Sequence, residues 1–312
     1  METILDVRGV SKRYGRREVL REITFSAKKG EIIALLGRNG TGKSTLMNMM
    51  TGYLCQTGGE ITVCGDDTLE SPMKTRAHIG YLPEQPPLYP DMTVREYLHY
   101  CAQLRGMSHK QQKQETERVI ELTGLNEYAS RLSGRLSKGY RQRLGVAQAL
   151  LPHPSLLILD EPGSGLDPLQ MVQMRDVIRK AGEESTVLLS SHLLSEVTNV
   201  CRRAIVLDHG HICFDGTMTS LLQGAARIRL RYRGDDGLIA LLSAIPGVTS
   251  VTDAECSEDG AAQLIIHHEL HADLRAQVSA CCLNNGYELL EMTSEGALEE
   301  AFLDVIGQKE EN

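Results

Sequence analysis

The sequence lacks any apolar run long enough to cross a membrane. A membrane-spanning helix needs about 18 consecutive apolar residues, and the 312-residue chain contains no such stretch. Its opening segment, METILDVRGV, also lacks the apolar centre of a secretory signal peptide. We therefore expect a cytosolic chain, unless a partner protein holds it at a membrane.

The chain also lacks cysteine pairs with the spacing of a metal or redox site. Its eight cysteines form no CxxC motif and no regular framework, so in a reducing compartment they are expected to act as small buried hydrophobic residues. The histidines His209, His211, His267 and His268 have no cysteine pair beside them. The sequence therefore favours neither a disulfide framework nor a zinc site.

The sequence also has no overall excess of positive charge. The net charge is −8, and residues 225–312 carry 6 Lys or Arg against 16 Asp or Glu, which leaves 27 against 25 in residues 1–224. A nucleic-acid-binding protein usually shows a basic face, so we expect no nucleic-acid partner. The local basic clusters at 12–21 and 131–143 are either solvated surface or the surroundings of a polyphosphate.

Short apolar runs alternate with helical patterns through the first 224 residues. EIIALLG, SLLILDEP and TVLLSSH are typical of buried parallel strands, whereas ILDVRGV and VLREITFSA alternate as half-buried strands do. Residues of about 93–152 have a helical pattern. These features predict an α/β core with a mostly parallel sheet, an N-terminal antiparallel β portion and an inserted helical subdomain.

A second domain is expected to begin near residue 225. In RIRLRYR the residues Ile228, Leu230 and Tyr232 alternate with arginines, which predicts a strand with one buried face. The later segments follow the order strand, helix, strand, strand, helix, strand, ending in a helix over ALEEAFLDVI. This order predicts a small βαββαβ-like α+β domain over 225–312.

A phosphate-binding motif follows the first buried strand. GRNGTGKS, Gly37–Ser44, fits the pattern GxxxxGK[ST] and lies between an apolar strand and a helix. Its glycines let successive main-chain N–H groups point at a phosphate. Lys43 adds a positive charge for the outer phosphates, and the Ser44 hydroxyl can bind Mg²⁺. This motif predicts that the core is a P-loop NTPase.

Two carboxylates end the next buried strand. LLILDEP places Asp160 and Glu161 at the carboxyl edge of the sheet, where ligands bind in open α/β folds. Asp160 is expected to hold Mg²⁺, and Glu161 to polarise the attacking water as a general base. His192 ends the following strand and could donate to the outermost phosphate.

A second anion-facing helix start occurs at LSKGYRQRL. Ser137 and Gly139 precede a basic helix-forming run, as the N-terminus of an anion-binding helix requires. The sequence thus contains two such starts, far apart in one chain.

Together these motifs resemble the ATP-binding subunits of bacterial ABC transporters, of the drug, polysaccharide and gliding-motility exporter type. The resemblance covers roughly residues 1–220 and includes several motifs in the family's order. It identifies 136–140 as the signature motif, 164–167 as the D-loop, and Asp160 and Glu161 as Walker B, with His192 as the switch histidine. It implies that ATP is bound by Tyr14, stacked on adenine, and by the Walker A residues Gly37, Asn39, Gly40, Gly42, Lys43, Ser44 and Thr45.

The resemblance also implies partners that explain the second helix start. In this family two subunits pack head to tail, so Ser137 and Gly139 are expected to contact the ATP that the other subunit holds. A homodimer, a separate membrane permease and a peripheral position on the cytoplasmic face of the membrane are implied in the same way. The expected cofactors are ATP and Mg²⁺.

Four positions depart from the family's usual pattern. Lys138 and Tyr140 replace the usual Gly and Gln of the signature motif, and Gly163 replaces a frequent Thr beside the D-loop. At the Q-loop Glu84 stands where Gln is usual and Gln85 follows it. Either side chain could therefore reach Mg²⁺ and the attacking water.

A different kind of protein with the same core stays open at this point. Soluble ATPases of this superfamily act in DNA repair or translation, but they usually carry long coiled coils or two tandem ATP-binding halves, which this sequence lacks. The transported substrate is not indicated by any motif, because selectivity would lie in the membrane subunit.

Overall fold

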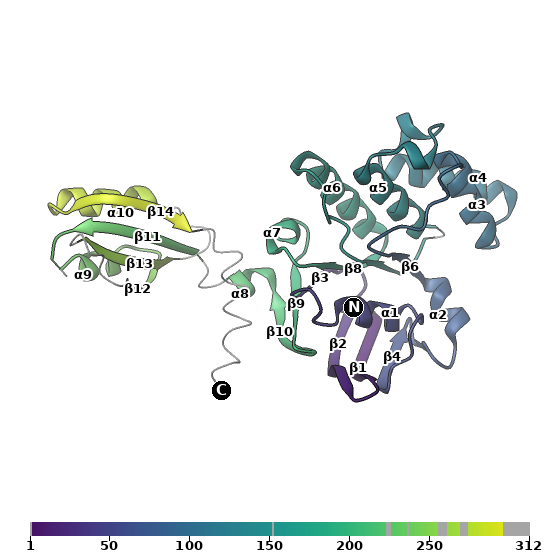
Figure 1. Cartoon of the computed structure of the whole chain (residues 1–312), viewed down its shortest axis with the longest axis horizontal. Coiled ribbons are helices and arrows are strands. Elements are labelled where there is room, and N and C mark those ends of the chain that lie inside the picture. Colours follow the sequence, from purple (N-terminus) through teal and green to yellow (C-terminus); the bar gives the residue numbers. More distant parts are fainter. Residues whose placement is uncertain are drawn as a thin grey trace. The chain divides into compact units, whose positions relative to one another are not determined.

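The computed structural model describes residues 2–151, 153–222, 226–235, 237–254, 261–268 and 274–295. These residues form two compact units, Met1–Gly216 and Thr217–Asn312, and each unit is considered by itself (Figure 1). The division falls slightly earlier than the boundary expected at 224. No helix in these described ranges combines the length and apolar character that a membrane crossing requires.

The first unit is built on a six-stranded sheet of order β10-β9-β3-β8-β7-β6. The pairs β3–β8, β3–β9, β7–β8 and β6–β7 are parallel, which confirms the predicted mostly parallel sheet. Every residue of β7 and β8 is buried, as expected for strands covered on both faces. The strands are β3 (Ile32–Leu36), β6 (Ile79–Leu82), β7 (Leu156–Leu159), β8 (Thr186–Ser191), β9 (Arg203–Asp208) and β10 (His211–Thr217).

A second, antiparallel sheet lies beside the first, in the order β2-β1-β4-β5. Its strands are β1 (Thr3–Tyr14), β2 (Arg17–Lys28), β4 (Gly58–Val63) and β5 (Asp66–Asp67). Helix α1 (Lys43–Met50) buries Leu46 and three methionines in one apolar cluster with residues of both sheets. The helix that follows the phosphate loop is therefore anchored by both sheets.

Helices surround the edge of the parallel sheet that β6 forms (Figure 1). Helix α3 (Val94–Leu104) begins with a capping box between Thr93 and Glu96, as helix N-termini favour. A proline ends a helix, so the sequence predicts that Pro152 stops the helix α5 (Lys138–Ala149), but Pro152 lies outside the described residues. The other helical elements of this unit are α2 (Pro72–His78), α4 (His109–Leu122), η1 (Asn126–Tyr128), η2 (Ser133–Arg135), α5 (Lys138–Ala149), α6 (Pro168–Glu184) and α7 (Leu194–Val197).

The second unit has a four-stranded antiparallel sheet of order β12-β13-β11-β14. Ile228, Leu230 and Tyr232 are buried in its core, as the alternation in RIRLRYR predicts. The closing helix expected over ALEEAFLDVI lies outside the described residues. The elements are α8 (Met218–Leu222), β11 (Ala226–Arg233), α9 (Gly237–Ser243), β12 (Val248–Ala254), β13 (Ala262–His268), α10 (Arg275–Asn284) and β14 (Glu288–Glu295).

Gly80 allows α5 to pack against β6. A Cβ atom at Gly80 would meet the main-chain carbonyl of Ala149 and lie 2.9 Å from Pro154 Cγ. We expect Gly80→Ala to lower the free energy of unfolding by about 1–3 kcal/mol, the usual cost of overpacking. Urea denaturation of the purified protein measures the change.

Gly58→Ala is the matched control, because none of the described atoms lies within 4 Å of a Cβ built on Gly58. Equal stability of the two variants would contradict the close packing of α5 on β6.

Candidate active site

The loop between β3 and α1 needs glycine at three positions. Gly40 (φ +84°) and Gly42 (φ +108°) have left-handed main-chain conformations that side chains rarely adopt. Gly37 has no room for a side chain, because a Cβ atom would lie 2.5 Å from the main-chain oxygen of Leu207. A loop of this kind can turn its N–H groups toward an anion.

Lys43 lies inside this loop with only 6% of its surface exposed. Its Nζ donates to the carbonyl oxygens of Gly37, at 2.6 Å, and Arg38, at 3.3 Å. The same nitrogen lies 3.5 Å from Glu161 Oε1. A buried ammonium group needs such partners, and its position beside the loop suits a phosphate ligand.

Asp160 and Glu161 follow β7 and are held by a serine of the neighbouring strand. Ser190 Oγ donates to Asp160 Oδ1 at 2.6 Å and accepts from the Glu161 N–H at 2.8 Å. Both acidic residues are buried. Glu161 has φ +48°, a conformation that costs a non-glycine residue of order 1–3 kcal/mol. The surrounding contacts therefore hold Glu161 in a strained but defined position.

Ser190 was not among the candidate residues from the sequence. Its signal was the pair of hydroxyl residues that ends the otherwise apolar run TVLLSS. A polar side chain in a fully buried strand usually has a partner, but the sequence does not show which one.

His192 lies beside Glu161 at the end of β8. Its Nδ1 is 2.8 Å from Glu161 Oε2, so Glu161 has Lys43 on one oxygen and His192 on the other. Nearby Tyr81 is affected by the same environment: burial, and to a smaller extent the negative charge of Asp160, raise the pKa of Tyr81 to about 12. The arrangement is a buried carboxylate between two nitrogen groups.

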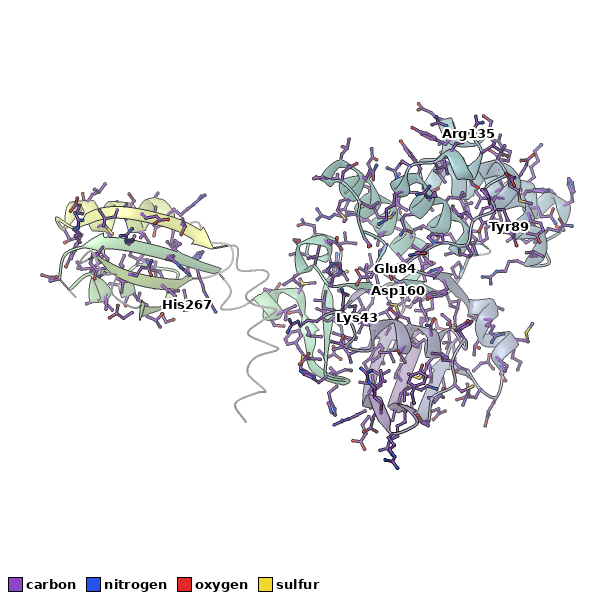
Figure 2. The ribbon with its side chains drawn as sticks, viewed as in Figure 1. Lys43, Glu84, Tyr89, Arg135, Asp160 and His267 are labelled. Carbon is purple, nitrogen blue, oxygen red and sulfur yellow. The ribbon has the colours of Figure 1, made fainter. Side chains whose placement is uncertain are left out.

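Lys43, Glu161 and His192 border a cleft of about 260 Å³. Figure 2 shows Lys43, Glu84 and Asp160 in the same part of the larger unit. The cleft is lined by Val19, Asn39, Gly40, Gly42, Lys43, Ser44, Thr45, Glu84, Glu161, Ser164 and His192.

The lining of the cleft distinguishes between Glu84 and Gln85, the two Q-loop candidates. Glu84 lines it, whereas Gln85 is absent from its lining and borders a neighbouring cavity of about 340 Å³ that Glu84 also borders. The geometry therefore favours Glu84 over Gln85 for contact with a ligand in the cleft.

Tyr14 does not line this cleft or the adjoining one of about 470 Å³ that continues along Arg38, Asn39 and Gly40. It lies at the end of β1 with 48% of its surface exposed, and Lys12 Nζ is 4.9 Å from the centre of its ring. Stacking of Tyr14 on adenine stays a prediction.

Ser137 and Gly139 lie outside the lining of the Lys43 cleft. Ser137 is exposed and precedes the first turn of α5. Gly139 is buried, and a Cβ atom there would lie 2.7 Å from Gln170 Oε1. The structure thus brings together the residues of the phosphate loop and the β7 and β8 ends, but not the second helix start.

The oxygen atoms in and next to the cleft suit Mg²⁺ when a phosphate shares the ion. Ser44 and Glu84 line the cleft, and Asp160 precedes the lining residue Glu161; all three offer oxygen ligands, which Mg²⁺ prefers. Within the described ranges, no group of three or more His, Cys, Asp or Glu side chains could hold a metal ion by itself. Mg²⁺ is commonly bound by one or two carboxylates together with substrate phosphates, so these residues fit that mode.

Several known proteins are similar to this chain. A family model described as ABC transporter matches residues 20–164. The bacitracin transport ATP-binding protein BcrA of Bacillus licheniformis is 33% identical over 315 residues, covering 98% of this chain and 98% of that protein. The linearmycin resistance ATP-binding protein LnrL of Bacillus subtilis (strain 168) is 32% identical over 311 residues, covering 98% and 99%. A solved structure of the ATP binding subunit of an ABC transporter has a TM-score of 0.63 and 30% identity, covering 70% of this chain and 91% of that chain.

The two hydrogen bonds that Ser190 makes to Asp160 and Glu161 give a test of the site. Ser190→Ala removes the donor to Asp160 and the acceptor for the Glu161 N–H, and each unsatisfied buried group costs about 1–3 kcal/mol. The two carboxylates would then be less well positioned for catalysis. We expect ATP turnover to fall by about tenfold or more, because an increase of about 1.4 kcal/mol in the activation free energy slows a reaction tenfold.

Ser191→Ala is the control, since Ser191 is also buried but bonds to Leu193 and Glu196 instead. Steady-state phosphate release compares the two variants. Equal losses would show that Ser190 acts only through the stability of β8.

Proposed function

This chain belongs to the ABC transporter ATP-binding family, whose members hydrolyse ATP to drive transport, and from that premise we propose that it powers export through a separate membrane permease. It would bind Mg-ATP in the Lys43 cleft and lie peripherally on the cytoplasmic face of the membrane, held there by the permease.

The observation that carries the proposal is the cluster beside the phosphate loop in which the buried side chains of Lys43 and Glu161 meet the half-buried His192. Lys43 would neutralise the outer phosphates of ATP, and Glu161 would accept a proton from the attacking water. His192 holds one oxygen of Glu161 at 2.8 Å, which leaves the other oxygen and Lys43 facing each other. The same cluster can therefore bind the substrate and orient the general base.

Mg²⁺, held by Ser44, Asp160 and Glu84 together with phosphate oxygens, would supply positive charge to the leaving phosphates. The protein's own part is to position these oxygens, and the Ser190 contact fixes Asp160 for it.

Ser137 and Gly139 supply the reason for a dimer. They do not line the chain's own cleft, although the start of a helix, whose first N–H groups have no partner within the helix, is suited to a phosphate. In a head-to-tail pair each copy would present Ser137 and Gly139 to the ATP of the other copy. One helix N-terminus neutralises only part of the charge of a triphosphate, and a second one completes the neutralisation.

Export is favoured by the relatives that match over nearly the whole chain, which are named for bacitracin transport and linearmycin resistance. A compound similar to bacitracin or linearmycin is the substrate that these names suggest. The alternative role in DNA repair or translation is not favoured, because both of these relatives are ATP-binding proteins of transport or resistance systems.

Glu161→Gln tests the composite site. The amide cannot accept a proton, so we expect ATP hydrolysis to fall by about 10²-fold or more, while ATP binding persists and holds two copies together. Light scattering after size exclusion, with saturating Mg-ATP, should show a dimer.

The same variant with Mg-ADP is the control and should remain monomeric. A monomer in saturating Mg-ATP would contradict the head-to-tail arrangement.

Ser137→Ala tests the other half of the composite site. Loss of a hydrogen bond to a charged group costs about 1.5–3 kcal/mol, so we expect turnover to fall by about 10- to 100-fold. Binding of a fluorescent ATP analogue to the dilute monomer should stay within about twofold, because Ser137 lies outside that cleft.

Ser130→Ala, at another exposed serine of the same helical region, should change neither quantity. If Ser137→Ala instead weakens monomeric ATP binding and leaves turnover of the bound complex intact, the assignment of Ser137 to the opposite site is wrong.

A further inference from the structure

Helix α5 lies directly against the loop that carries Glu84. Gln142, in the second turn of this helix, donates from Nε2 to the main-chain oxygen of Glu84 at 2.9 Å. One turn later, Gly145 leaves no space for a side chain, because a Cβ atom would lie 2.9 Å from Pro86 Cγ and meet Leu82. The helix and the loop are therefore in van der Waals contact and joined by a hydrogen bond.

The N-terminal end of α5 contacts the D-loop region as well. The Lys138 side chain lies against Gly165, and Gly139 packs against the side chain of Gln170. Gln170 in turn donates its N–H to Asp167 Oδ1 at 2.8 Å. One helix thus contacts two of the loops that border the cleft of its own chain, those of Glu84 and Ser164.

Burial of the Gln142 amide lowers the stability of the protein, because one of its polar atoms has no hydrogen-bond partner among the described residues. The residue is 2% exposed, and no described group donates a hydrogen bond to its buried Oε1. A buried acceptor without a donor lowers stability, and an apolar side chain of the same size would avoid that penalty. The N–H donor to Glu84 is the feature that an apolar residue could not replace.

We propose that Gln142 is a positioning residue that ties the main chain of Glu84 to α5, so that the ligand contact in one cleft and the Ser137 end of α5 move together. The Glu84 side chain lines the cleft of its own chain, and Ser137 begins the helix that serves the other copy. This inference rests on the proposed function, because only a dimer gives the Ser137 end a ligand. Gln142 then couples the two nucleotide sites.

Gln142→Met removes the N–H donor and keeps nearly the same side-chain volume. We expect kcat for ATP to fall by about three- to tenfold, the range that one hydrogen bond supplies. The KM should change by less than about twofold, and the Hill coefficient for ATP should fall toward that of independent sites, since positioning links the sites without forming the cleft. The melting temperature should stay the same or rise, because the unsatisfied Oε1 is removed as well.

Gln112→Met is the matched control. Gln112 is also a buried glutamine, 8% exposed, and its Nε2 donates to the Met107 carbonyl at 2.7 Å, within the helical region away from both loops. It should lower the melting temperature and leave kcat and the Hill coefficient close to those of the wild type.

A purely structural role for Gln142 predicts the opposite result: a lower melting temperature with unchanged kcat and Hill coefficient. That result would overturn the inference and leave the proposed function intact. Absence of ATP turnover by the wild-type protein would overturn both. If Gln142→Met does not fold, Gln142→Ala gives the same comparison, and an unchanged Hill coefficient in that variant overturns the inference.

Discussion

The structure depends on one buried group of charges at the carboxyl end of the parallel sheet. Lys43 and Glu161 are 6% and 7% exposed and lie 3.5 Å apart. Charges taken out of water cost several kcal/mol each unless partners surround them. Here the partners are loop carbonyls for Lys43, and His192 and the Ser190 hydroxyl for the Glu161 side chain and main chain. Since three elements must meet at one point to supply these contacts, the charges require the sheet order β3-β8-β7 that the fold provides.

The rest of the first unit holds the residues around these charges in place from two sides. The two sheets enclose α1 and fix the direction in which the phosphate loop opens. On the other side α5 packs closely on β6 and on the Glu84 loop through Gly80 and Gly145. Glycine at both contacts lets α5 approach the sheet and the Glu84 loop closely. A displacement of the loop would therefore also displace the helix. A site built from loops on such a frame can change position without loss of the core.

The second unit shows how an acidic segment tolerates a row of arginines. Arg231 is paired across strands with Glu291, and Arg233 with Glu288, whose carboxylate is 3.5 Å from the guanidinium. Opposite charges on facing residues of neighbouring strands stabilise a sheet modestly, whereas the interleaved Ile228, Leu230 and Tyr232 fill the core. The alternation in one short segment therefore builds both the core face and the charged face.

The sequence alone determined whatever is encoded in contiguous residues: the phosphate loop, the pair Asp160 and Glu161 after an apolar strand, the mostly parallel sheet and the buried face of β11. Their physics is local, because strand periodicity, glycine conformation and the order of neighbouring groups can be read within about ten residues. Only the tertiary structure decided the contacts between distant residues. Ser190 reaches Asp160 across 30 positions, and Gln142 reaches Glu84 across 58. Such pairs depend on which strands become neighbours and how closely a helix packs on a loop, and hydrogen-bonding side chains do not specify their partner until that packing exists.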